Sequence, residues 1–169
     1  MLVISQVSKF YGDAPALAPT DLQVPGGETL VLIGPSGCGK STLLRLIAGL
    51  IQPDSGSITF EGTRLSSENI LQIRQRMGYV IQEGGLFPHL TVRDNVTVMA
   101  RYLRLDASWI DCRLNELAQL VRLPEEMMSR FPAELSGGQR QRVSPYGANI
   151  RMSRMILLLR NITDNLFVQ

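Results

Sequence analysis

The most informative stretch of the chain reads Gly34-Pro35-Ser36-Gly37-Cys38-Gly39-Lys40-Ser41. It matches the phosphate-loop pattern G-x-x-x-x-G-K-[ST] at every defined position. Glycines allow the backbone to adopt positive φ values and to approach a phosphate closely, so that successive N–H groups point toward the anion. We therefore expect Lys40 to reach the β- and γ-phosphates of a nucleotide and the Ser41 hydroxyl to ligate Mg²⁺. Residues 34–41 are called the phosphate loop below.

The flanking sequence has the order that a phosphate loop requires. The short apolar run from Glu28 to Ile33 predicts a buried strand before the loop. A helical apolar face follows the loop, formed by Leu43, Leu44, Leu46, Ile47 and Leu50. Gly49 stands where this helix is expected to end. The start of the helix near Lys40, including Thr42, would add the positive end of its dipole to a phosphate site. A glycine-rich hairpin with a chance lysine does not account for this order.

The rest of the chain divides into a mixed α/β half and a mainly helical insert. Strands are predicted at Leu2–Val7, Asp21–Val24 and Ser57–Phe60, with a turn at Pro53-Asp54-Ser55-Gly56. From residue 91 to residue 128 the pattern is helical. Two pairs are spaced as capping boxes, Thr91 with Asp94 and Ser108 with Asp111. One helical face carries Ile110, Leu114, Leu117 and Val121.

Composition limits the classes of protein that this chain can be. Its 169 residues provide one domain with a core, and 44% apolar with 19% charged residues is ordinary for a globular protein. The net charge of +2 gives no indication of nucleic acid or an anionic membrane as partner. Cys38 and Cys112 form no disulfide or metal-ligand framework, as in a reducing cytoplasm. The sequence shows no signal peptide and no apolar run long enough to span a bilayer.

A second glycine motif selects one family among the proteins that use phosphate loops. It reads Leu135-Ser136-Gly137-Gly138-Gln139-Arg140-Gln141-Arg142-Val143 and resembles the signature of ABC-type ATP-binding domains. The alternative interpretation is a flexible Ser-Gly-Gly turn, which is a common feature by itself. The resemblance implies that Ser136, Gly137, Gly138 and Gln139 face the γ-phosphate of an ATP held by a second subunit, in a head-to-tail dimer. Physically, this would be another anion-binding helix start.

The resemblance also implies a fold. This is a P-loop NTPase of the α/β class, with an antiparallel β portion and a helical subdomain, truncated at its C-terminus. The expected organisation of the single domain, residues 1–169, is an α/β core at 1–90, the helical subdomain at 91–135, the signature motif at 136–143 and an atypical tail at 144–169.

Three weaker matches complete the site that the resemblance implies. Tyr11 corresponds to the aromatic residue that stacks on adenine, although alone it would be an ordinary half-buried strand tyrosine. Gln82 corresponds to the glutamine that contacts Mg²⁺ and the attacking water. The segment from Glu83 to Val96, with the apolar pair Leu86-Phe87, resembles the segment that docks on a membrane-embedded permease, although the pair is equally consistent with packing inside. His89 comes too early in the chain to be the family's γ-phosphate-sensing histidine, so we expect a plain loop role for it.

The resemblance ends near Val143. Pro145 and Gly147 oppose a helix where the family has one. The apolar run from Met155 to Leu159 stands where the family has a strand ending in Asp-Glu, the pair that holds Mg²⁺ and polarises the attacking water. Here the run ends in Arg160-Asn161, and Asp164 does not match in spacing. We interpret residues 144–169 as the product of a shifted reading frame or a gene rearrangement; the alternative is a diverged tail in a regulatory ATP-binding protein.

Two functions follow from the resemblance. The first is the ATPase subunit of an ABC importer, which uses ATP and Mg²⁺, pairs with a second ATP-binding subunit and docks on a permease at the cytoplasmic face of the plasma membrane. A solute-binding protein would act with it indirectly, and nucleic acid is no partner. The second is a remnant that binds nucleotide without hydrolysing it. An ABC protein of DNA repair or translation is a third possibility within the family. Residues 76–89 look most like importers of osmoprotectants and quaternary amines, followed by importers of polar amino acids.

Overall fold

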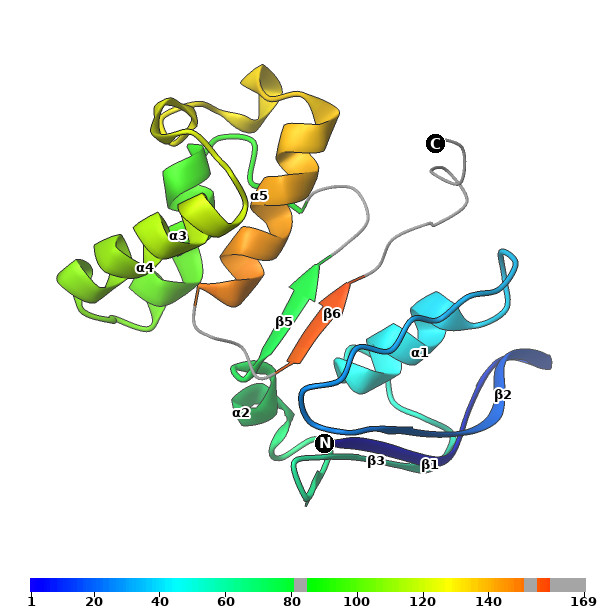
Figure 1. The fold of residues 1–169 in the computed structure, drawn as a ribbon. Helices are drawn as coiled ribbons and strands as arrows, with labels where there is room; N and C mark the ends of the chain where they lie inside the picture. The colour runs from blue at the N-terminus through cyan, green and yellow to red at the C-terminus, as the bar shows by residue number, and fades with distance from the viewer. Residues whose placement is uncertain (81–84, 151–154, 159–169) are drawn as a thin grey trace. The chain divides into compact units, whose positions relative to one another are not determined.

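The computed structural model describes residues 1–80, 85–150 and 155–158. The chain divides into two compact units, of which the first ends at Gln75 and the second begins at Arg76 (Figure 1). Each unit is considered by itself below.

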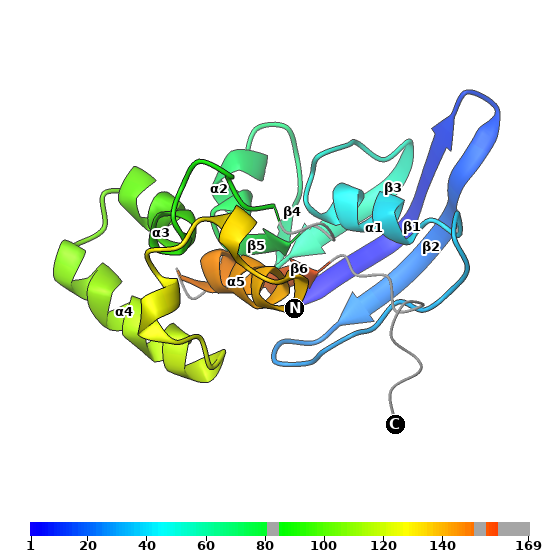
Figure 2. The same ribbon diagram turned by 90° about the horizontal axis from the view of Figure 1, so that it is seen from above.

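The first unit is built on an antiparallel sheet of four strands. These are β1 (Leu2–Tyr11), β2 (Ala14–Val24), β3 (Ser55–Phe60) and β4 (Thr63–Arg64), in the order β2-β1-β3-β4. Figure 2 shows β1 and β2 as one long paired ribbon. The three predicted strands are confirmed, and each is longer than its apolar pattern indicated. Inward-facing residues such as Leu2, Ile4 and Ile58 are almost completely buried.

A bulge interrupts β1 at Gln6, where the register with β2 shifts between Ile4 and Val7. Gln6 has a φ of 49°, an unusual value for a residue with a side chain. Its backbone N–H donates to the Asp21 carboxylate at 2.8 Å, and its side-chain amide donates to the other carboxylate oxygen. Asp21 on β2 therefore satisfies the backbone group that the bulge takes out of the ladder.

Helix α1 (Lys40–Ile47) follows the phosphate loop directly, as predicted. Its apolar face buries Leu43, Leu46 and Ile47. The helix ends at a left-handed glycine, Gly49, whose N–H donates to the carbonyl of Leu46 at 2.9 Å. The short helix α2 (Ile70–Arg74) completes the unit, and the Arg74 guanidinium donates to the carbonyls of Ala48 and Gly49. The end of α1 is thus fixed by a conventional glycine C-cap and by an arginine.

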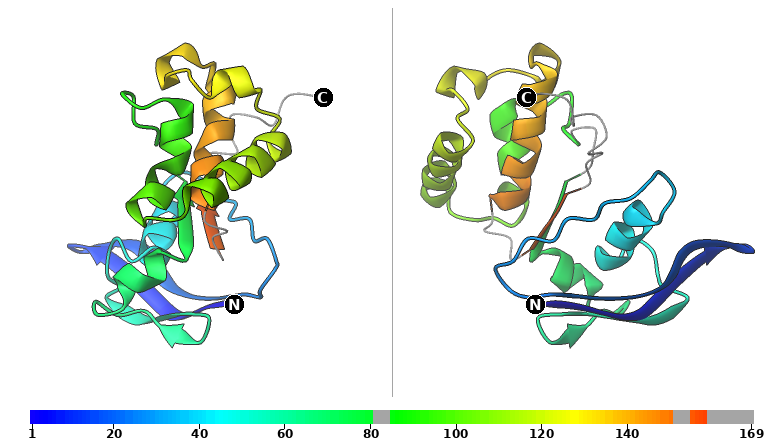
Figure 3. Two further views of the ribbon diagram at one scale, coloured as in Figure 1. Left: turned by 90° about the vertical axis from the view of Figure 1, so that its left-hand side faces the viewer. Right: turned by 45° about the vertical axis from the view of Figure 1, so that its right-hand side comes forward.

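The second unit packs three helices against one another and beside a pair of parallel strands. The helices are α3 (Val92–Tyr102), α4 (Ala107–Leu120) and α5 (Gly137–Asn149); the strands are β5 (Met77–Val80) and β6 (Met155–Leu158). Short 3₁₀ turns at Glu125–Met127 and Pro132–Glu134 join α4 to α5. Figure 3 shows the three helices side by side. Their shared core contains Val92, Val96, Ala100, Ile110, Leu114, Leu117, Leu123, Met128, Leu135, Val143 and Ile150.

The structure corrects three expectations about local structure. The first concerns residues 28–33, which form no strand; the side chain of Ile33 is 83% exposed. A strand is stable only when a neighbour accepts its backbone hydrogen bonds, and no described strand pairs with this segment. The second concerns the start of α4. Asp106 caps it by accepting from the N–H of Trp109 at 2.9 Å, so the predicted Ser108–Asp111 capping box is wrong.

The third correction concerns α5, which continues through Pro145 and Gly147 to Asn149. Both residue types disfavour a helix interior. Val143 and Ile150 are completely buried in the helical core and lie seven residues apart, on one face of a helix. Tertiary burial of that face stabilises the helix against the unfavourable local sequence, because most helical stability in proteins comes from packing.

Candidate functional site

The phosphate loop contains two left-handed glycines, Gly37 with a φ of 84° and Gly39 with a φ of 91°. Gly39 also packs tightly against β2: a Cβ atom at this position would lie 2.8 Å from the carbonyl oxygen of Ala16. A Cβ at Gly37 would meet no atom within 4 Å. Gly39 is therefore required both by its backbone conformation and by space, whereas Gly37 is required by conformation alone.

The side chain of Lys40 lies back over the loop that precedes it. Its ammonium donates to the carbonyl oxygens of Gly34 at 2.6 Å and Pro35 at 2.8 Å, and it lies 3.4 Å from the Sγ atom of Cys38. The positive charge predicted to meet phosphate is thus inside the curve of the loop. A phosphate that binds there replaces these carbonyls as the acceptor of the hydrogen bonds that the Lys40 ammonium donates.

The start of α1 is suited to an anion. Its N-cap, Gly39, provides no side-chain hydrogen bond, and the first turn contains no acidic residue. The first N–H groups of any α-helix have no partner within the helix, and they carry the positive end of its dipole. Left-handed glycines, an uncapped helix start and Lys40 together fit a phosphate chain of a nucleotide.

A magnesium ion fits the same place through Ser41, which is exposed in the first turn of α1 beside Thr42. Mg²⁺ prefers oxygen ligands and is commonly held by one or two protein groups together with phosphate oxygens and water. Among the residues that the structure describes, no group of three or more His, Cys, Asp or Glu side chains is arranged to hold a metal. Gln82, the other predicted magnesium contact, lies outside the described residues.

Tyr11, the predicted adenine contact, closes β1 in the same unit as the phosphate loop. Its side chain is 53% exposed, and the Lys9 ammonium lies over its ring, 5.9 Å from the centroid. An exposed aromatic ring at the end of a strand is able to stack on a base.

The predicted signature residues form the start of α5 in the second unit. Ser136 is the N-cap: its hydroxyl accepts from the Gln139 N–H at 3.2 Å, and its own N–H donates to the Gln139 side chain at 2.7 Å. Gly137 and Gly138 are exposed, and a Cβ at either would meet nothing within 4 Å. The Ser136 hydroxyl keeps its proton for an outside acceptor. The capping box therefore presents an open, glycine-lined helix start.

The predicted docking segment is partly described. Leu86 packs against the helical core, whereas Phe87 is 49% exposed and contacts the ring of His89 edge-on, with centroids 6.0 Å apart. The Leu86-Phe87 pair is thus divided between the interior and the surface. The first two residues of the segment, 83 and 84, lie outside the described residues. The same holds for Arg160, Asn161 and Asp164.

Sequence reasoning missed the residue that holds this segment, Asn95. Its side chain is 7% exposed; the amide nitrogen donates to the carbonyls of Phe87, Leu90 and Thr91, and the amide oxygen accepts from the N–H of Phe87 at 2.7 Å. The signal in the sequence that indicates this role is a polar residue, Asn95, on the apolar face of the helix that begins at Val92. Such a residue is seldom buried without bonding nearby backbone groups.

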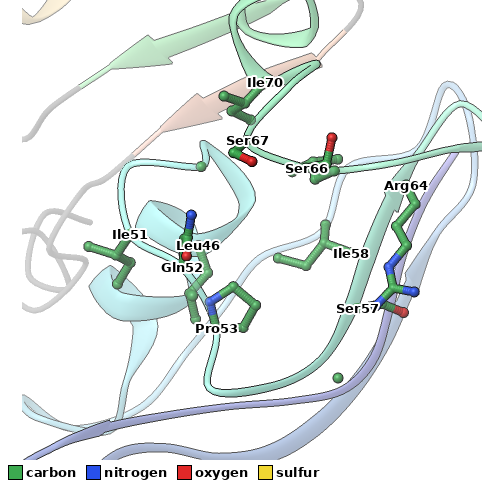
Figure 4. Close-up of a pocket in the computed structure, with 13 residues that line it drawn as sticks. Leu46, Ile51, Gln52, Pro53, Ser57, Ile58, Arg64, Ser66, Ser67 and Ile70 are labelled. Atoms are coloured by element: carbon green, nitrogen blue, oxygen red, sulfur yellow. The ribbon is translucent and has the colours of Figure 1, made fainter.

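A separate cavity of about 280 Å³ lies in the first unit at the far end of α1 from the phosphate loop (Figure 4). Leu46, Ile58 and Ile70 form its apolar wall, and Arg64 and Ser66 contribute polar atoms. It contains no residue of the phosphate loop and is not part of the candidate nucleotide site.

Comparison with known proteins gives a consistent picture. The family model described as "ABC transporter" matches residues 17–158, beyond the boundary expected at Val143.

The chain is 40% identical over 159 residues to the glycine betaine/carnitine/choline transport ATP-binding protein OpuCA of Bacillus subtilis, covering 94% of this chain and 42% of that protein. It is 43% identical over 143 residues to the glycine betaine uptake system ATP-binding protein YehX of Escherichia coli, covering 85% and 46%. The sulfate/thiosulfate import ATP-binding protein CysA of Gloeobacter violaceus is 43% identical over 157 residues, covering 93% and 45%. The chain thus spans less than half the length of these relatives.

Among the solved structures that resemble this one, two illustrate the likeness. The first is cbiO1 from Clostridium perfringens, part of the ABC transporter complex cbiONQ, with a TM-score of 0.84 and 26% identity over 93% of this chain and 64% of that one. The second is the ATP-binding cassette MJ0796, a dimer in a post-hydrolysis state bound to ADP and Pi, with a TM-score of 0.80 and 24% identity over 97% and 89%. At the second identity the likeness supports the fold alone.

Proposed function

The chain belongs to the ABC transporter family, and on that premise we propose that it is the ATP-binding subunit of an ABC importer. In this role it binds MgATP on the phosphate loop and couples nucleotide binding and hydrolysis to solute transport through a permease. The observation that carries the proposal is the uncapped start of α1 behind two left-handed glycines, Gly37 and Gly39. That arrangement matches the chemistry of a triphosphate.

Each residue of the site has a distinct task in this proposal. The N–H groups of the loop and of the first turn of α1 donate to phosphate oxygens. Lys40 exchanges its bonds to the loop carbonyls for the β- and γ-phosphates, and the Ser41 hydroxyl ligates the metal. Mg²⁺, when bound, neutralises charge on the phosphate chain. Tyr11 stacks on the adenine, and Gln82 orients the water and contacts the metal.

A second subunit completes the site. In the proposed head-to-tail dimer, Ser136, Gly137, Gly138 and Gln139 of one copy face the γ-phosphate bound by the other. The capping box supports this role, because it leaves the glycine N–H groups at the start of α5 exposed to an anion. Phosphate is then contacted from two sides, which links dimer formation to nucleotide binding.

The permease is the partner that connects the site to transport. We place the docking segment at residues 83–96, where Phe87 is exposed and Asn95 fixes the backbone. Among the described residues no helix is long and apolar enough to cross a bilayer. In the proposal, the subunit attaches to the cytoplasmic face through the permease, and a solute-binding protein acts only indirectly.

The proposed solute is a quaternary amine or related osmoprotectant. Relatives named for glycine betaine, carnitine and choline transport support this class. The sulfate/thiosulfate relative is equally similar in identity, and the ATP-binding subunit does not touch the solute. The assignment therefore rests on kinship and is tested on the assembled transporter.

A second function, nucleotide binding without hydrolysis, is favoured by one specific observation. Strand β6 pairs in parallel with β5, and the sequence after its end at Leu158 reads Leu159-Arg160-Asn161, where the family has Asp-Glu. Without a carboxylate at that place, the attacking water has no general base of the usual kind.

Phosphate release by the purified full chain at saturating MgATP distinguishes the two functions, with Lys40→Ala as the control. Turnover that depends on Lys40 supports the importer ATPase. Nucleotide that stays bound and intact supports the second function. Turnover that is equal in wild type and Lys40→Ala contradicts the assignment of the site, because the phosphate loop then takes no part.

A further inference from the structure

Asp54 connects the segment after α1 to the end of β1. Its backbone N–H donates to the Ser8 carbonyl at 3.0 Å. One carboxylate oxygen accepts from the Phe10 N–H at 2.7 Å, and the other accepts from the Lys9 ammonium at 2.7 Å. Three consecutive residues of β1 are thus bonded to one aspartate, immediately before Tyr11.

A second contact strengthens the same junction. The hydroxyls of Ser8 and Ser55 lie 2.7 Å apart, and Ser8 is only 3% exposed. The Ser55 hydroxyl also donates to the Gln6 carbonyl at 3.1 Å. The Asp54–Ser55 segment therefore holds β1 across its irregular stretch, where the register with β3 shifts between Ser5 and Ser8.

Lys9 transmits this anchoring to the tyrosine ring. Its side chain is 16% exposed, and its ammonium forms the ion pair with Asp54 while lying over the Tyr11 ring. A cation within about 6 Å of a ring centroid attracts the ring and restricts its orientation. Asp54 holds the Lys9 ammonium in place, and the ammonium in turn restricts the orientation of the Tyr11 ring.

We propose that Asp54 is a positioning residue for recognition of the nucleotide base, acting through Lys9 and the Phe10 backbone on Tyr11. This inference rests on the proposed function, because it assumes that Tyr11 stacks on the base. The ordering of Tyr11 before binding reduces the entropy lost when the base stacks, so base affinity rises.

Asp54 acts on the base and not on the phosphates. Along the chain it follows α1, whereas the phosphate loop precedes that helix. None of the hydrogen bonds that Asp54 forms involves the phosphate loop. Its removal should therefore weaken a ligand that carries a base and leave a base-free phosphate chain unaffected.

The experiment compares the affinities of the full chain for MgATP and for inorganic tripolyphosphate with Mg²⁺. Asp54→Ala should weaken MgATP by about three- to tenfold, the range expected for a lost cation–π and stacking contribution, and change tripolyphosphate less than twofold. Asp54→Asn should restore part of the loss, since its amide oxygen still accepts from Phe10. Asp13→Ala removes the same charge from the adjacent β1–β2 turn and serves as the matched control, with both affinities unchanged.

A double variant separates positioning from a general structural effect. In a Tyr11→Leu background, Asp54→Ala should cause no further loss of MgATP affinity, because the residue that it positions is gone. Equal losses for both ligands, a full loss in the Tyr11→Leu background, or no loss at all would each overturn the inference. If Asp54→Ala does not fold, Lys9→Met replaces it, with the same selective loss expected. Wild type that binds neither ligand refutes the proposed function itself, and the inference with it.

Discussion

The Lys40 ammonium lies 2.6 Å from the carbonyl oxygen of Gly34, so the lysine of the phosphate loop is bonded to the first glycine of that loop. The loop is therefore closed on itself before any phosphate arrives. Its curvature depends on this closure and on the two left-handed glycines. Substitutions of the glycines test the curvature separately from the charge.

Gly39→Ala should destabilise the first unit more than Gly37→Ala does. Both residues have a left-handed φ, which costs a residue with a Cβ about 1–2 kcal/mol. Only at Gly39 does the new Cβ also meet backbone, the Ala16 carbonyl oxygen at 2.8 Å. Urea unfolding of the two variants measures the difference. Equal destabilisation would show that the packing of the loop against β2 does not contribute.

Arg104→Gly should stabilise the second unit by about 0.5–1 kcal/mol. Arg104 has a φ of 55° just after α3, and the N–H groups of Arg104 and Leu105 donate to the carbonyls of Arg101 and Ala100. This is a helix ending in which glycine is preferred, because glycine has no steric cost at positive φ.

Arg122→Gly provides the matched test at the end of α4. Arg122 has a φ of 51°. As at the end of α3, its N–H donates to a carbonyl three residues earlier, that of Gln119, and the N–H of Leu123 donates to the carbonyl of Ala118. Both variants should raise the melting temperature. A decrease in either would mean that the arginine side chain contributes more than its backbone strain costs.

Asn95→Ala should destabilise the second unit by about 2–3 kcal/mol. The substitution leaves the N–H of Phe87 without its acceptor and removes the donor shared by three carbonyls. The exposed Asn115→Ala on α4 is the control and should stay within about 0.5 kcal/mol of wild type. Denaturant titration measures both, and similar values for the two would contradict the role given to Asn95.

Acidification should weaken the cap of α4. The Ser108 hydroxyl and the Trp109 N–H donate to the Asp106 carboxylate and lower its pKa below the ordinary value of 3.8. A carboxyl group whose pKa is lower in the folded state than in the unfolded state stabilises the folded protein at pH values above its unfolded-state pKa. This contribution is lost as the pH falls through the folded-state value.

Asp106→Asn tests the source of this pH dependence. Asparagine caps helices about as well as aspartate but does not titrate. The variant should match wild type near neutral pH and lose less stability below about pH 4. Unfolding followed by helical circular dichroism at several pH values measures this; parallel curves for the two proteins would exclude Asp106 as a source.

Local signals in the sequence predicted much of this structure. The phosphate loop, α1 with its end at Gly49, strands β1, β2 and β3 and the buried face of α4 each follow from a short pattern with one physical cause. The Thr91 cap of α3 is also confirmed, since its hydroxyl accepts from the Asp94 N–H at 3.1 Å. The continuation of the family match to residue 158 was not predicted, because the sequence was expected to leave the family pattern near Val143, whereas α5 runs to Asn149 and β6 pairs with β5.

Other features needed three-dimensional context. Residues 28–33 have a strand-like composition, but a strand also needs a neighbour, which composition does not reveal. The choice of Asp106 over Ser108 as the cap depends on where the helix begins. The junction of Asp54 with Lys9 and Phe10 joins residues more than forty positions apart, so no local pattern indicates it.

The most direct test of the account is equilibrium binding of MgATP to the purified full chain and to Lys40→Ala, measured by calorimetry. We predict saturable binding by wild type and little or none by Lys40→Ala, with the two proteins equally folded by circular dichroism. Absence of binding by wild type, or equal affinity in the two proteins, would contradict the claim that this phosphate loop holds a nucleotide.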